Sequence, residues 1–136
     1  MTRRSRGREV ALQLLFQRDH NPAIAHDDIA TFARNRLRDP ELTAFCLGLY
    51  DGVVAHLEQI DDRLTAAAEN WRLPRMATVD RNVLRLGAYE LLHTPETPAA
   101  VAFDEAIELA RRYGSADSPA FVNGVLDRLR REASVT

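Results

Sequence analysis

The sequence predicts an all-α protein, a compact bundle of about seven helices that forms a single domain over residues 1–136. Apolar residues recur at helical spacing along most of the chain, and no segment shows the alternation of a strand or a hairpin turn. A side chain that can cap a helix also directly precedes proline at three places. These are Asp39-Pro40, Thr97-Pro98 and Ser118-Pro119.

The expected helices follow one another with short turns between them. They cover residues of about 5–20, 27–37, 40–57, 59–70, 78–93, 98–113 and 118–132. In the sixth range the apolar side chains fall on one face, and the acids and arginines fall on the other. Such a face needs a neighbouring helix to cover it, which predicts a bundle. Gly114 is expected to end this helix in the left-handed conformation.

Composition restricts the possible functions. All 18 basic residues are arginine, and the net charge is −2. Binding to a nucleic acid therefore requires a local basic patch, because the whole chain is not a polycation. The single cysteine, Cys46, lies on an apolar helical stripe and is expected to be a small core side chain. No signal-peptide pattern and no apolar run of membrane length occurs, so we expect a cytoplasmic protein.

Four arginines lie close together near the N-terminus. Arg3, Arg4, Arg6 and Arg8 form what we call the N-terminal arginine cluster. Their mutual repulsion is unfavourable without an anion, and phosphates are the obvious candidate. A solvated basic tail explains the charge pattern equally well. Charge alone leaves both interpretations open.

Apolar side chains outside the expected core suggest contact surfaces. Leu12 and Phe16 point away from the core face of the first helix, which predicts a second apolar surface, unless a neighbouring helix covers it. Phe121 flanks the core stripe of the last helix, just after Asp117-Ser118 at its start. A ring there can stack on a base, although packing on the preceding loop fits the periodicity better.

Two acidic residues lie in the apolar arc of the fifth helix. Asp80, near the start of that helix, either helps to cap it or marks a protein interface. Glu90, near the end of the helix, is expected to pair with an arginine, because a buried carboxylate needs a partner.

Four blocks of the chain resemble the NusB family of bacterial transcription antitermination factors. They are RRSRGREVALQLLFQ (3–17), IDDRL (60–64), VDRNVLRLGAYELL (79–92) and VAFDEAIELARRYGSADSPAFVNGVLDRL (101–129). The resemblance implies a seven-helix fold, no cofactor and no catalysis. It also implies binding to boxA RNA of nascent ribosomal transcripts together with NusE, a small-subunit ribosomal protein, within an antitermination complex on RNA polymerase.

The resemblance also assigns roles to matching residues. It implies RNA contacts at the arginines that open the first helix, and again where the last helix begins. It places Asp80 on the side of the partner. Phe16 replaces the usual tyrosine, and the lost hydroxyl removes one possible hydrogen bond to the partner or RNA. With Arg3 and Leu12 added from the patterns above, the expected RNA-binding residues are Arg3, Arg4, Arg6, Arg8, Asp117, Ser118 and Phe121, and the expected partner-binding residues are Leu12, Phe16 and Asp80.

Three other functions are conceivable for such a chain. An RNA methyltransferase is disfavoured, because the chain has no glycine-rich cofactor loop after a strand. A metal-dependent hydrolase would need ligands from His20, His26, Asp27 and Asp28, but their spacing does not place two on one helical face, so no metal is expected. The third is a self-associating RNA-binding scaffold that acts without NusE, in which Leu12 and Phe16 are buried in a homodimer.

Overall fold

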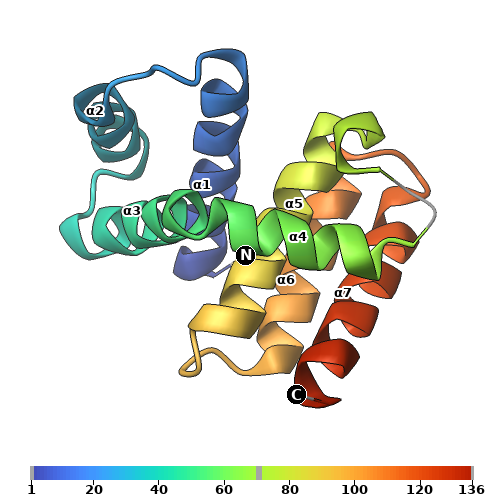
Figure 1. Ribbon diagram of the computed structural model, residues 1–136. Coiled ribbons are helices and arrows are strands. Elements are labelled where there is room, and N and C mark those ends of the chain that lie inside the picture. Colours follow the sequence, from blue (N-terminus) through green and yellow to red (C-terminus); the bar gives the residue numbers. More distant parts are fainter. Residues whose placement is uncertain (1, 70–71, 136) are drawn as a thin grey trace.

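The predicted all-α bundle is confirmed by a computed structural model, which describes residues 2–69 and 72–135, with side chains up to residue 133 (Figure 1). No strand occurs in that part of the chain. The helices are α1 (Arg3–His20), α2 (His26–Leu37), α3 (Pro40–Ala55), α4 (Leu57–Ala67), α5 (Thr78–His93), α6 (Ala99–Tyr113) and α7 (Ser118–Val135), and a 3-10 helix (Leu73–Arg75) precedes α5.

Most helix boundaries agree with the prediction, but the corner between α3 and α4 lies two residues earlier than expected. His56 alone forms this corner, with φ −110° and ψ 18°, and α4 begins at the next residue. The predicted end of the fourth helix at residue 70 lies outside the described residues, and α4 itself ends at Ala67.

Only one of the three predicted proline caps has the expected geometry. Asp39 caps α3, since its carboxylate accepts a hydrogen bond from the Leu42 N–H at 3.0 Å. Thr97 does not cap α6, because Pro98 occupies the cap position and moves the helix start one residue further along the chain. Ser118 lies inside α7, and its hydroxyl accepts a hydrogen bond from the Ser115 N–H at 2.9 Å.

The prediction that Gly114 adopts the left-handed conformation is wrong. Its φ is −95°, which any residue can adopt. Glycine is needed there for space, because a Cβ would lie 2.4 Å from the Ser118 hydroxyl and 2.8 Å from the Ala110 carbonyl oxygen. The turn between α6 and α7 is therefore closely packed around Ser118.

Helix α5 lies at the centre of the molecule. It packs against α1, α3, α4, α6 and α7, and in Figure 1 it lies between α1–α3 on the left and α6 and α7 on the right, with α4 crossing in front of it. Its apolar side chains Val83 and Leu84 are fully buried in the core. Gly87 faces Leu126 of α7 so closely that a Cβ would lie 2.8 Å from the leucine methyl carbon.

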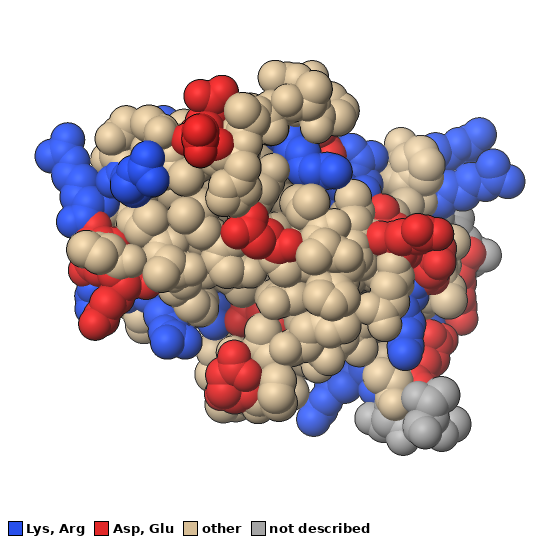
Figure 2. All heavy atoms as spheres, turned by 60° about the vertical axis from the view of Figure 1, so that its left-hand side comes forward, with Lys and Arg blue, Asp and Glu red and all other residues tan. Residues whose placement is uncertain are grey.

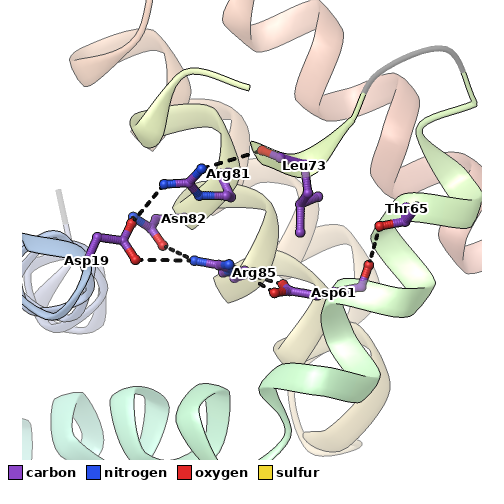
Figure 3. A network of polar contacts seen from close by, with 7 residues as sticks. All are labelled: Asp19, Asp61, Thr65, Leu73, Arg81, Asn82 and Arg85. Carbon is purple, nitrogen blue, oxygen red and sulfur yellow. Dashed lines mark hydrogen bonds and ion pairs between the residues drawn. The ribbon is translucent and has the colours of Figure 1, made fainter. Parts of the chain in front are cut away.

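A polar network fixes α1 and α4 to this central helix (Figure 3). Arg85 of α5 makes two hydrogen bonds of 2.9 Å to Asp61 of α4 and lies 3.5 Å from Asp19 of α1. The fully buried Asn82 donates to Asp19 at 2.8 Å and accepts from Arg85 at 3.1 Å. Arg81 donates to the same Asp19 at 3.2 Å. The network therefore holds the end of α1 against both α5 and α4.

Candidate nucleic-acid interface

Charge is mixed on the molecular surface. Figure 2 shows the face that carries the left-hand helices of Figure 1, and there basic and acidic side chains are interspersed around a largely uncharged centre. The net charge of −2 agrees with this distribution. On this face, binding to a polyanion would therefore depend on individual arginines that the helices hold in place.

The N-terminal arginine cluster belongs to a helix. Thr2 caps α1, since its hydroxyl accepts a hydrogen bond from the Ser5 N–H at 3.1 Å, and helical geometry begins at Arg3. The side chains of the cluster therefore point in directions set by the helical repeat of about 100° per residue. Closeness in the sequence does not place all four on one surface.

Three arginines of the cluster reach the surface. Arg4 is exposed, and its guanidinium lies 4.6 Å from the centre of the Phe45 ring on α3. Arg3 pairs with Asp39, and Arg6 pairs with Glu9. The cation–π contact restricts the motion of Arg4 without neutralising its charge. Arg4 is therefore the best-placed member of the cluster for an incoming anion.

Arg8 is not available for RNA, contrary to the prediction. It is 3% exposed, and its guanidinium donates two hydrogen bonds to Glu90 of α5, at 2.7 and 2.8 Å. Glu105 of α6 lies 3.5 Å away. Burial lowers the pKa of Arg8, but the hydrogen bonds and charge of Glu90, with the charge of Glu105, outweigh this effect and raise it. Arg8 is therefore the arginine partner that the sequence led us to expect for Glu90.

Glu9 connects the start of α1 to the end of α6. Besides Arg6, it accepts a hydrogen bond from Arg112 at 2.7 Å and one from the Tyr113 hydroxyl. Burial raises the pKa of Glu9, but the hydrogen bonds from Tyr113 and Arg6 and the charges of Arg6 and Arg112 lower it overall. Glu9 therefore remains ionised and holds Arg6 and Arg112 on one surface.

Sequence reasoning missed Arg112 and Tyr113 as candidate contacts. Tyr113 is 40% exposed, one of only two large hydrophobic side chains so exposed in the described residues. Both residues directly precede the turn that leads to Asp117. Their adjacency is visible in the sequence, but their shared contact with Glu9 of α1 is not.

The start of α7 supplies two of the three expected side chains. Asp117 is exposed and Phe121 is half-buried, and Phe121 lines a shallow hollow of about 260 Å³ together with Gly124 and Arg128. Ser118 is 2% exposed, and its hydroxyl is engaged by the Ser115 N–H. The expectation of a direct Ser118 contact is thus corrected, because that side chain stabilises the turn.

Of the three expected partner-binding residues, one is buried and two are partly exposed. Leu12 is 1% exposed and belongs to the core, because neighbouring helices cover the side of α1 on which it lies. Phe16 packs at the edge of the core and stays partly exposed. Asp80 is partly exposed, and its Oδ1 is buried without a hydrogen-bond partner among the described residues. Phe16 and Asp80 therefore remain as candidates, and Leu12 does not.

The described residues give little support for a metal site, a reactive cysteine or a membrane span. They contain no group of three or more potential metal ligands. His26 is hydrogen-bonded to Asp51 at 2.8 Å. Cys46 is buried, which raises its pKa to about 12, with the charge of Asp51 as a further cause. None of the described helices is long and apolar enough to cross a membrane.

Comparison with known proteins decides the family. The model of the NusB family matches residues 5–131. The chain belongs to the NusB family. It is 54% identical over 129 residues to the transcription antitermination protein NusB of Sorangium cellulosum (strain So ce56), a match that covers 95% of this chain and 92% of that protein. The resemblance predicted from the four sequence blocks is thereby confirmed.

Solved structures agree with this assignment. A structure of T. maritima NusB is 37% identical to this chain, with a TM-score of 0.85 over 97% of this chain and 92% of that chain. A structure of the antitermination factors NusB and NusE in complex with dsRNA is similar in fold, with 24% identity and a TM-score of 0.87 over 97% of this chain and 98% of that chain. The chain is thus a NusB-type antitermination factor and not an enzyme.

Proposed function

We propose that this NusB-family chain binds boxA RNA of nascent ribosomal transcripts together with a NusE partner, and that the complex helps RNA polymerase to read through terminators in the cytoplasm. The observation that supports this best is Arg4, an exposed guanidinium without a carboxylate partner in the described part of the chain, at the head of α1. The similar structure of NusB with NusE and dsRNA supports the same pair of partners.

The proposed roles follow the surface positions of the side chains. Phosphates are bound by Arg3, Arg4 and Arg6. To bind RNA, Arg3 leaves Asp39 and Arg6 leaves Glu9. Phe121 stacks on an unpaired base, and Asp117 accepts hydrogen bonds from base edges. Arg8 and Ser118 support these positions from the interior. The whole chain, residues 1–136, acts as one RNA-binding domain.

The first test compares boxA-like RNA with a scrambled RNA. Arg4→Gln should weaken binding to both RNAs alike and reduce the salt slope by about 0.7, because one phosphate contact is lost. Phe121→Ala should weaken binding to boxA-like RNA by about 1–3 kcal/mol and affect the scrambled RNA less. Fluorescence anisotropy at two salt concentrations measures both effects. Arg131→Gln, an exposed arginine near the end of α7, is the charge-matched control.

Wild-type protein that binds both RNAs with equal affinity would contradict boxA recognition. Equal losses for both RNAs with Phe121→Ala would remove that ring from base recognition.

The second test concerns the partner. NusE should tighten RNA binding, and RNA should tighten NusE binding by the same factor, because such coupling is reciprocal. Phe16→Ala should reduce the affinity for NusE by at least about 1 kcal/mol and leave RNA binding without NusE unchanged. Titration calorimetry with and without RNA measures this cycle. Unchanged RNA affinity at saturating NusE, or a stable homodimer in light scattering, would favour the self-associating scaffold.

A further inference from the structure

A shallow groove lies between the last turn of α2 and the first turns of α3, and none of the residues assigned above to RNA or NusE lines it. Its volume is about 500 Å³. Two arginines line it together with mostly small or apolar side chains. The lining includes Arg34, Arg38, Pro40, Thr43, Ala44 and Leu47.

The two arginines of the groove are not neutralised by the protein. Arg34 donates a hydrogen bond to the Thr31 hydroxyl at 3.1 Å, and neither Arg34 nor Arg38 has a salt-bridge partner within the described ranges. The first 40 residues carry eight arginines against five carboxylates, while the chain as a whole is acidic. The groove itself is lined by two arginines and one carboxylate, Asp39, which already pairs with Arg3, although arginines also suit the end of any helix.

Contacts across the α2–α3 turn connect the groove with the N-terminal arginine cluster. Asp39 lines the groove, and it is also the salt-bridge partner of Arg3. Arg4 lies against Phe45 of α3, close in the helix to the groove residue Ala44. Asp39 therefore links the groove directly to Arg3 of the cluster, and α3 contributes both to the groove and to the contact with Arg4.

We propose that this groove binds the sugar–phosphate backbone of single-stranded RNA that continues from the segment held by the cluster. Guanidinium groups at Arg34 and Arg38 match phosphate oxygens, and the apolar lining accommodates ribose. The proposal rests on the proposed RNA-binding function and extends the length of RNA that the protein covers. The groove adds affinity without reading sequence, since its contacts are made to the backbone.

The test compares a short boxA-like core RNA with the same core extended at either end by unstructured oligouridylate. The extension at one end should tighten binding of the wild-type chain. The Arg34→Gln/Arg38→Gln variant should lose this gain, become roughly tenfold weaker for that RNA at low salt, and show a salt slope shallower by about 1.4, because two phosphate contacts are removed. Its affinity for the core RNA should not change.

Arg36→Gln is the matched control, since Arg36 lies on the same helix but packs on the Phe32 ring and does not line the groove. An equal loss with Arg36→Gln, or no gain from either extension, would overturn the proposal. A variant that instead loses binding to NusE, or self-association, would identify a protein interface and also overturn it. Oligouridylate alone, measured at low salt, keeps the test independent of boxA recognition, because the wild-type chain should bind it more tightly than the double variant.

Discussion

Arg8→Ala is expected to lower the free energy of unfolding by about 3–5 kcal/mol, although the residue lies in a sequence pattern typical of an RNA-binding arm. The reason is the environment of Glu90, which is 3% exposed and receives both of its short hydrogen bonds from Arg8. Without the guanidinium, a carboxylate remains buried with no cation beside it. Glu105, which is partly exposed, also loses a neighbouring charge.

Chemical denaturation monitored by circular dichroism measures this loss. The exposed Arg4→Ala is the control within the same cluster, and its effect should stay within about 0.5 kcal/mol. The double variant Arg8→Met/Glu90→Leu should recover most of the stability, because replacing a buried ion pair with apolar side chains of similar size is often neutral.

The double variant also separates a structural role of Arg8 from a role in RNA binding. It lacks the Arg8 guanidinium but keeps Arg3, Arg4 and Arg6, so it should bind RNA with nearly wild-type affinity once it is folded. The salt dependence of RNA affinity tests this. If the folded double variant has a shallower salt slope than the wild-type chain, by the amount expected for one lost phosphate contact, then Arg8 leaves Glu90 and binds RNA. A stability loss below about 1 kcal/mol for Arg8→Ala would contradict the buried pair itself.

The helices were predictable because their signals are local. Apolar spacing determines where α1, α3 and α5 lie, and Asp39-Pro40 marks the start of α3 through a cap that involves only neighbouring residues. The caps at Thr97 and Ser118 failed because the exact start of a helix depends on the packing of the turn before it. At Ser118 that turn is tight enough to exclude a Cβ on Gly114.

The candidate site was less predictable, because partners distant in the sequence determine which of its side chains are buried or paired and which remain exposed. Periodicity gives the angles of Arg8 and Leu12 around α1, but it does not say which of these angles other helices cover. Arg8 meets a carboxylate 82 residues away, and Glu9 meets Arg112 103 residues away. The expectation that Glu90 has an arginine partner was correct on chemical grounds, yet the sequence offered 18 candidates.

Arg85→Ala should lower the free energy of unfolding by about 3 kcal/mol, because it breaks a partly buried network of several hydrogen bonds and not a single surface ion pair. The side chain is 11% exposed and holds Asp61 with two hydrogen bonds of 2.9 Å, while it also contacts Asp19 and Asn82. Arg85→Lys should recover only part of the loss, because an ammonium group cannot make the paired hydrogen bonds to a carboxylate.

The consequences of Arg85→Ala should extend to RNA binding, because Asp19 is where the network holds the end of α1 (Figure 3). Amide hydrogen exchange should become faster at the end of α1, and RNA affinity should fall without a change in the salt slope, since no phosphate contact is removed. Arg131→Ala, which breaks an exposed pair with Asp127, should alter stability by less than about 0.5 kcal/mol. If Arg85→Ala were as mild as Arg131→Ala, the position of α1 would depend on its apolar packing against α3 and α5, and the polar network would contribute little to holding the N-terminal arginine cluster in place.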